Sequence, residues 1–154
     1  MKKSVQPTIE ISVRKQELAL KVGPKKVASF PISTSRFGLG TEAGSFKTPT
    51  GRFRIAEKIG DDAPVGTVFK SRRPVQPTER MLREEDLIMT RILWLDGVDP
   101  ENANTHARYV YIHGTNHEDQ IGTPASDGCV RMRSADVLEL YNRVPTGTPV
   151  VIRP

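Results

Sequence analysis

Glycine and proline interrupt this chain so often that long regular elements are excluded over most of its length. Each occurs 12 times among 154 residues, and both favour turns over the interiors of helices and strands. Between these interruptions, apolar and polar residues alternate over short stretches, which is typical of half-buried strands. We therefore predict a mainly β, sandwich-like domain of short strands. The length fits a single domain over residues 1–154, with its core at about residues 9–153.

The strand pattern occurs in several segments and the helix pattern in one. Segments 9–13 and 18–22 flank a polar turn and predict a hairpin. Further strands are predicted at 27–32, 53–56, 68–70, 91–95, 108–112 and 149–152. One short helix is predicted with Ser134 as its N-cap. Residues 78–89 fit either a short helix or a loop, and Tyr109 and Tyr111 should share a face of their strand.

Two long irregular segments, 33–50 and 96–107, separate these elements. Loops of this length in a compact domain are usually functional. We therefore expect them to border a site.

The bulk composition excludes several partners. The net charge is +5 and the pI is about 9.6, but basic residues form only short clusters and aromatics make up 6% of the chain. A nucleic-acid partner is therefore not expected. No apolar stretch reaches the roughly 18 residues of a membrane span. No apolar segment follows Met1-Lys2-Lys3, so no export signal is visible. We expect a monomer.

Cys129 is the single cysteine, which excludes an internal disulfide and a cysteine-rich zinc site. His113 directly follows the predicted strand 108–112, and a polar loop that could fold back separates it from Cys129. A thiol needs a base because little of it is ionised at neutral pH, and an imidazole can take its proton. From the residues alone, the pair fits a nucleophile and its base, and equally a buried thiol and a core histidine.

Longer stretches of sequence around Cys129 and His113 favour the catalytic interpretation of this pair. Residues 112–115 and 121–132, which include Ser126-Asp127-Gly128-Cys129-Val130-Arg131, resemble the signature of the L,D-transpeptidase catalytic domain, the YkuD-like family. Residues 136–141 and the upstream block 44–53, with its Thr-Pro-x-Gly sequence, also resemble that family. The resemblance covers roughly residues 9–153.

This resemblance implies a fold and a reaction. The fold is the β-rich catalytic domain with a helix after the cysteine loop, and the substrate is peptidoglycan. The cysteine attacks the third residue of a tetrapeptide stem, D-Ala leaves, and a thioester forms. An amine of a neighbouring stem then resolves the thioester into a 3→3 crosslink. The family implies no metal or organic cofactor, and a location in the cell envelope or periplasm.

The resemblance also assigns roles. Cys129 matches the nucleophile and His113 the catalytic histidine, while Gly114 stands where that histidine is oriented. Gly128, together with the cysteine, matches the turn whose amides face the oxyanion.

Three further residues of the cysteine loop match the motif or depart from it. Ser126 matches the small hydroxyl residue that opens the motif. Arg131 matches an arginine that holds a substrate carboxylate or braces the loop. Asp127 departs from the family, which usually has histidine there. A carboxylate near a thiol disfavours the thiolate, so we expect a Cys129 less reactive than in histidine-bearing relatives.

Other readings remain open. An L,D-carboxypeptidase would use the same residues with water as acceptor, and Asp127 keeps open a wall-binding module with weak or no activity. A cysteine peptidase of unrelated fold is disfavoured by the upstream match at Thr48-Pro49-x-Gly51. His117 could partly replace the missing histidine, but it and His106 are interpreted as solvated loop residues.

Overall fold

The computed structural model describes residues 6–154. The segment Met1-Lys2-Lys3, on which the expectation about an export signal rests, lies outside the described residues. Within residues 6–154, no helix is long and apolar enough to cross a membrane.

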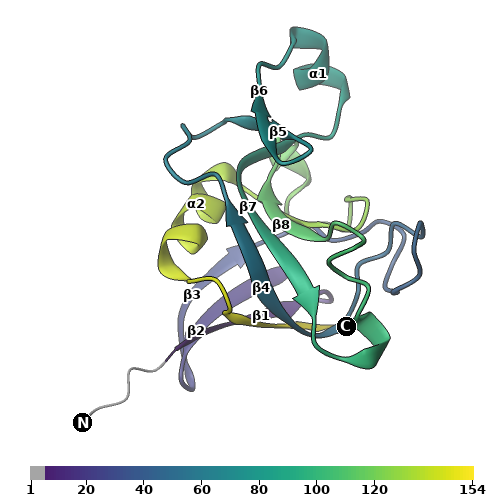
Figure 1. The fold of residues 1–154 in the computed structure, drawn as a ribbon, viewed down its shortest axis with the longest axis vertical. Helices are drawn as coiled ribbons and strands as arrows, with labels where there is room; N and C mark the ends of the chain where they lie inside the picture. Colours follow the sequence, from purple (N-terminus) through teal and green to yellow (C-terminus); the bar gives the residue numbers. More distant parts are fainter. Residues whose placement is uncertain (1–5) are drawn as a thin grey trace.

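The chain folds as one continuous, strongly curved sheet with a helix packed against it (Figure 1). The strands are β1 (Pro7–Ser12), β2 (Glu17–Val22), β3 (Lys25–Pro31), β4 (Gly51–Ile59), β5 (Val68–Lys70), β6 (Arg73–Val75), β7 (Ile88–Gly97), β8 (Tyr111–Gly114), β9 (Val130–Met132) and β10 (Pro149–Arg153). The helices are α1 (Glu79–Glu84) and α2 (Ser134–Arg143), and the 3-10 turns are η1 (Pro100–Asn102) and η2 (Glu118–Gln120). The predicted mainly β class is confirmed.

The strand order places the C-terminal strand β10 between the N-terminal strand β1 and strand β4. The path runs β3-β2-β1-β10-β4-β7-β5-β6, and β8 joins β7 to β9 off this path. Strand β1 pairs with β2 as the predicted hairpin, with Ile9 opposite Leu20 and Ile11 opposite Leu18. These four residues are buried because alternate side chains of a strand face the same side. The N-terminal strands therefore supply one wall of the core.

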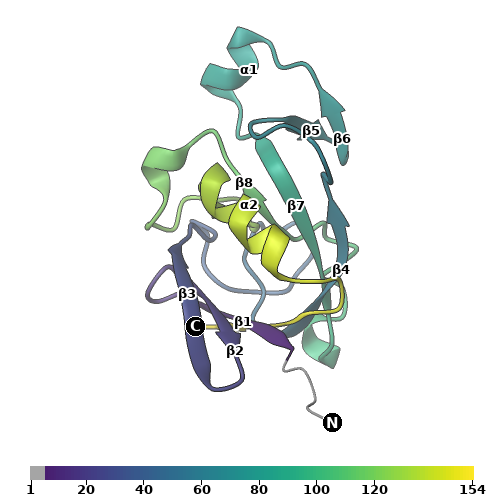
Figure 2. The same cartoon turned by 90° about the vertical axis from the view of Figure 1, so that its left-hand side faces the viewer.

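Helix α2 covers the other side of this core (Figure 2). It buries Val137, Leu140 and Tyr141 and contacts β7 and β8. The predicted N-cap is shifted by one residue: Ser134 is the first helical residue, and its amide donates to the Glu118 carboxylate at 2.8 Å. Helix α2 thus supports β8 by packing against it.

One strand prediction was wrong, and two short strands, β6 and β9, were not predicted. The segment predicted as a strand at 108–112 forms its strand at Tyr111–Gly114 instead, so His113 lies inside β8 and not after it. The reason is Tyr109, whose φ of 57° breaks an extended chain. Strand β9 was not predicted, because three buried residues carry no alternation that a pattern could detect.

Candidate active site

Cys129 stands at the junction of two cavities. It immediately precedes β9 and is half-buried. The larger cavity, about 300 Å³, is lined by loop 43–46 and segment 107–110. The smaller one, about 120 Å³, is lined by His113 and by residues of the loops around it. Both cavities include Asp127 and Cys129, so the thiol can be reached from two sides.

The turn before the thiol is held by hydroxyl groups. Gly128 has a φ of 121°, which a side chain would disfavour. Ser126 Oγ donates to the Cys129 carbonyl at 2.6 Å and accepts from the Gly128 amide at 3.3 Å. Thr48 Oγ1 donates to the Gly128 carbonyl at 2.9 Å. A hydrogen bond therefore joins the Thr-Pro-x-Gly block to the cysteine loop, although 80 residues separate Thr48 from Gly128 in the sequence.

His113 is oriented by a backbone carbonyl. Its side chain is buried, with 3% of the residue exposed, and Nδ1 lies 2.5 Å from the carbonyl oxygen of Gly114. Since a carbonyl only accepts, the proton resides on Nδ1 and the lone pair on Nε2. Burial lowers the pKa of His113, and the Gly114 carbonyl partly offsets this effect. The ring is therefore neutral and able to act as a base.

A β-bulge opposite His113 requires glycine at position 114. The register of β7 against β8 shifts between Met89 and Ile92, and the bulged Thr90 has a φ of 73° although it is β-branched and fully buried. A Cβ on Gly114 would lie 2.6 Å from the Met89 carbonyl oxygen. Bulges and backbone strain of this kind cluster next to active sites. This bulge lies directly opposite the strand that carries His113.

The resting thiol is protonated. Burial raises the pKa of Cys129 to about 11, although the amide of Tyr111, which donates to Sγ at 3.3 Å, acts in the opposite direction. The thiol donates to the Tyr109 carbonyl at 3.5 Å. Cys129 and His113 share the smaller cavity, but no hydrogen bond joins them in the part of the chain that the structure describes.

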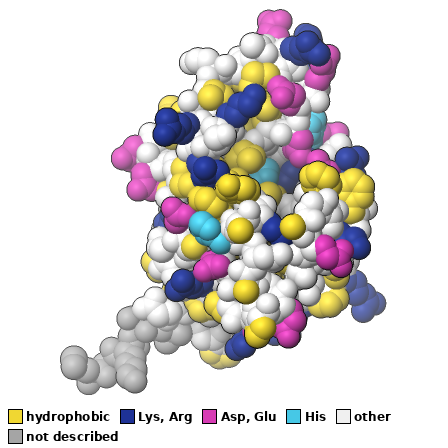
Figure 3. Space-filling view, turned by 45° about the vertical axis from the view of Figure 1, so that its right-hand side comes forward, with side chains coloured by type: hydrophobic (Ala, Val, Ile, Leu, Met, Phe, Trp, Pro, Cys, Tyr) yellow, Lys and Arg dark blue, Asp and Glu magenta, His cyan; other side chains and the backbone are white. Residues whose placement is uncertain are grey.

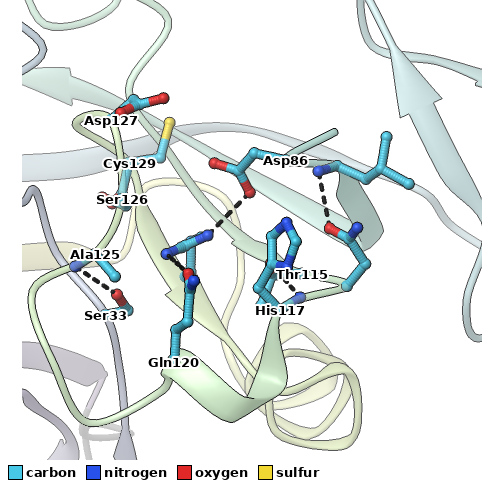
Figure 4. A network of polar contacts seen from close by, with 12 residues as sticks. Ser33, Asp86, Thr115, His117, Gln120, Ala125, Ser126, Asp127 and Cys129 are labelled. Atoms are coloured by element: carbon cyan, nitrogen blue, oxygen red, sulfur yellow. Dashed lines mark hydrogen bonds and ion pairs between the residues drawn. The ribbon is translucent and has the colours of Figure 1, made fainter. Parts of the chain in front are cut away.

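Asp86 is a site residue that the sequence analysis missed. It lines the smaller cavity with Cys129 and His113, and its charge raises the pKa of both groups. Its Oδ1 accepts from Arg131 Nη1 at 3.0 Å (Figure 4). It lies in the segment 78–89 that fitted either a helix or a loop, so no pattern pointed to it.

Arg131 braces the site. The residue is 1% exposed, and its guanidinium also donates to Gln120 Oε1 at 2.8 Å. A substrate carboxylate cannot reach a side chain so enclosed. Of the two roles considered for this arginine, the structure therefore supports bracing, with Asp86 as the residue that it holds.

Neither loop histidine lies at the thiol. His117 is half-buried and its Nε2 lies 3.1 Å from the Glu85 carbonyl. The neighbouring Asn116 donates to the Leu82 and Glu85 carbonyls, so both residues fix the segment that carries Asp86. His106 stacks on Trp94 with ring centroids 3.9 Å apart.

Asp127 is turned toward an arginine. Its Oδ1 accepts from Arg36 Nε at 3.2 Å, and the two side chains form an exposed ion pair. The carboxylate that raises the pKa of Cys129 is Asp86. The lower reactivity expected of Cys129 from Asp127 stays a prediction.

The larger cavity has strained aromatic residues and a cation in its wall. Phe46 and Tyr109 line it, both more than half exposed and both with positive φ, 59° and 57°. Tyr111 is buried instead, so the two tyrosines do not share a face. Arg108 lines the same cavity and donates to the Lys47 carbonyl at 2.8 Å. Figure 3 shows one face of the molecule, with hydrophobic side chains gathered near its middle.

Comparison with known proteins identifies the family. The model of the L,D-transpeptidase catalytic domain, YkuD, matches residues 6–152. The chain belongs to this family. It is 27% identical over 144 residues to the putative L,D-transpeptidase YkuD of Bacillus subtilis, covering 94% of this chain and 64% of that protein. A shorter match to the putative L,D-transpeptidase YkuD of Bacillus licheniformis is 56% identical over 43 residues, 28% of this chain and 26% of that protein.

Solved structures confirm the L,D-transpeptidase fold. The L,D-transpeptidase of Xylanimonas cellulosilytica aligns over 99% of this chain and 63% of its own, with a TM-score of 0.64 and 21% identity. The L,D-transpeptidase from Mycobacterium smegmatis aligns over 97% of this chain and 59% of its own, with a TM-score of 0.63 and 16% identity. The chain thus spans about three fifths of these structures.

Proposed function

We propose that this domain is a peptidoglycan L,D-transpeptidase with Cys129 as nucleophile and His113 as general base. The observation that carries the proposal is the shared cavity, in which a neutral imidazole of fixed tautomer faces the same space as the thiol. Family membership supports an acyltransferase of this class. Since peptidoglycan is the substrate, we place the protein in the cell envelope.

The first half of the reaction acylates the thiol. The thiol proton, directed at the Tyr109 carbonyl in the resting protein, turns toward the smaller cavity and passes to His113 Nε2. Sulfur attacks the carbonyl carbon of the third stem residue. The imidazolium returns the proton to the departing amine of D-Ala, and a thioester remains. The amine of an acceptor then attacks the thioester carbon; the C–N bond forms, the C–S bond breaks, and His113 passes the amine proton to the departing sulfur, which restores the thiol.

The raised pKa of the Cys129 thiol is consistent with a proton transfer to His113 that occurs together with the attack of sulfur on the substrate. With a pKa of about 11, almost no thiolate exists at neutral pH. Proton transfer therefore accompanies attack and does not precede it, which confines reactivity to bound substrate. Burial lowers the pKa of His113, and the Gly114 carbonyl and the Asp86 charge partly offset this effect, so these two groups favour the charged ring that forms when His113 takes the proton.

Charge that develops on the substrate oxygen needs donors close to the thiol. The Gly128 amide is directed to Ser126 Oγ, and we assign the oxyanion contact to the Cys129 amide. Arg108, whose charge acts on the Cys129 thiol, adds a positive potential on the side of the larger cavity. We therefore place the donor stem in that cavity.

Product analysis tests the proposal. The protein is incubated with purified disaccharide-tetrapeptide, and the products are identified by mass spectrometry beside Cys129→Ala. A 3→3-linked dimer that is absent from the variant supports the transpeptidase. Tripeptide without dimer points to an L,D-carboxypeptidase. Unchanged substrate with both proteins would contradict an enzymatic role and favour a wall-binding module.

A further inference from the structure

We propose that Arg72 is a positioning residue for the catalytic thiol, and that it acts through the two tyrosines whose backbone groups bind Cys129. This inference rests on the proposed function, because the position of the thiol matters for turnover only if Cys129 is the nucleophile. The residues that line the two cavities at Cys129 do not include Arg72. Its side chain therefore reaches the site only through its neighbours.

Arg72 occupies a turn position that its own backbone does not favour. Ser71 and Arg72 form the two-residue loop between β5 and β6, with φ of 49° and 64°. Such loops favour Asn-Gly or Asp-Gly, since most residues with a Cβ are strained at positive φ. The turn itself thus gives no reason for an arginine at this position, and the contacts of the guanidinium supply one.

The guanidinium of Arg72 contacts three aromatic residues beside the thiol. Strand β5 pairs with β7, the strand that carries Trp94. Arg72 Cζ lies 4.9 Å from the ring centroid of Trp94 and 5.2 Å from that of Tyr109. Its Nη1 donates to the hydroxyl of Tyr111 at 3.2 Å. A planar guanidinium can stack on rings and donate hydrogen bonds in its own plane, so one side chain joins Tyr109 to Tyr111.

The backbone groups of these two tyrosines bind the sulfur of Cys129. The Tyr111 amide donates to Sγ at 3.3 Å, and the Tyr109 carbonyl accepts from the thiol at 3.5 Å. Tyr111 is buried and lies in β8, whereas Tyr109 is 54% exposed and precedes that strand. The φ of Tyr109, 57°, is a conformation that persists only where the surroundings hold it. Because Arg72 and Trp94 both pack on its ring, loss of Arg72 should release the Tyr109 carbonyl from the thiol.

The direction of the effect distinguishes positioning from a direct action of charge. A carbonyl accepts only from the protonated thiol, so release of the Tyr109 carbonyl favours the thiolate. Loss of a nearby positive charge would have the opposite effect, since a cation favours the thiolate. The released sulfur also loses one of the two contacts that fix it for attack, which should slow acylation. A variant at Arg72 should therefore ionise more readily at Cys129 and acylate more slowly.

Titration of the thiol tests the first of these effects. Arg72→Gln is compared with wild type and with Arg73→Gln, which changes the exposed arginine next to it. Thiolate formation is followed by ultraviolet absorbance, and the same protein with Cys129→Ala is subtracted to remove the signal of the tyrosines. We expect the ionisation constant of Cys129 to rise about two- to tenfold in Arg72→Gln, which corresponds to the loss of one hydrogen bond. In Arg73→Gln it should stay within about twofold of wild type.

Acylation tests the second effect. Thioester formation with saturating disaccharide-tetrapeptide is followed by mass spectrometry of the intact protein, and it should slow about tenfold in Arg72→Gln. Arg72→Lys keeps a cation over the rings and should recover part of both changes. Tyr111→Phe removes the hydroxyl that accepts from Arg72 and should reproduce part of both.

The outcomes separate this inference from the proposed function. An ionisation constant that is unchanged in Arg72→Gln, with or without a fall in Tm, would overturn the positioning role. A lower ionisation constant would overturn it too, because that is the effect of a lost positive charge and not of a released carbonyl. Failure of wild type to form a thioester would overturn the proposed function, while the titration would still decide whether Arg72 positions the thiol.

Discussion

The hydroxyl of Thr48 connects the upstream motif to the cysteine turn, and its removal should have a large cost. Thr48 is fully buried. Its Oγ1 donates to the Gly128 carbonyl at 2.9 Å and accepts from the Ser35 amide at 3.0 Å. Thr48→Val keeps the shape of the side chain and deletes both bonds. The change therefore isolates the contribution of the hydroxyl.

The magnitude follows from the two backbone groups left without a partner. Each buried, unsatisfied group costs about 1–3 kcal/mol, so Thr48→Val should lower the free energy of unfolding by about 3 kcal/mol. For a chain of this size, that corresponds to a fall in Tm of about 6–12 °C. Because the Gly128 carbonyl is released, the turn that positions Cys129 should loosen, and the rate of acylation should fall at least about tenfold.

Thermal denaturation and acylation kinetics together check this expectation. The matched control is Thr123→Val, which removes an exposed hydroxyl that donates to the Gln120 carbonyl at 2.8 Å. That control should change the free energy of unfolding by less than about 0.5 kcal/mol. If Thr48→Val melts within about 1 °C of Thr123→Val, the hydroxyl does not hold the turn, and the reasoning fails.

Three further outcomes follow from the site. Burial raises the pKa of Cys129 to about 11, so iodoacetamide should label the resting protein about tenfold faster per pH unit from pH 7 to 10; a plateau near pH 8.5 would contradict the raised value. His113→Gln should lower kcat/KM by about 10²–10⁴ with little change in Tm, measured by steady-state turnover, and unaltered turnover would exclude the general base. Gly114→Ala places a Cβ 2.6 Å from the Met89 carbonyl oxygen and should lower the free energy of unfolding by about 1–3 kcal/mol, measured by chemical denaturation. A free energy of unfolding equal to that of the wild type would show that the bulge can shift to accommodate the methyl group.

The sequence predicted the local parts of the fold well. The hairpin at the N-terminus and the helix after the cysteine loop are confirmed, because each is specified by alternation or helical periodicity within a short stretch, while the strand predicted at 91–95 extends further, over Ile88–Gly97. The prediction failed at Tyr109, where a residue of high strand propensity adopts a left-handed backbone. Tyr109 there packs beside Trp94, with ring centroids 5.7 Å apart.

The parts of the site that lie close in sequence to Cys129 were also predictable. The structure brings Cys129 and His113 to one cavity, and Ser126 and Gly128 shape the turn between them, as the motif indicates. Arg131 is present but enclosed. The distant Thr48 was noted only as part of a motif, since nothing in its neighbourhood reveals that it bonds to Gly128.

Asp86 shows why the remainder could not be read from the sequence. An aspartate in an irregular segment is ordinarily solvated, and no spacing relates it to the cysteine motif. It reaches the site because Asn116 binds the carbonyls of Leu82 and Glu85, while the buried Arg131 binds its carboxylate. An enclosed arginine requires such a partner, since an unpaired buried charge is costly. The burial of Arg131 therefore calls for a carboxylate partner, and the one that the fold supplies, Asp86, raises the pKa of both His113 and Cys129.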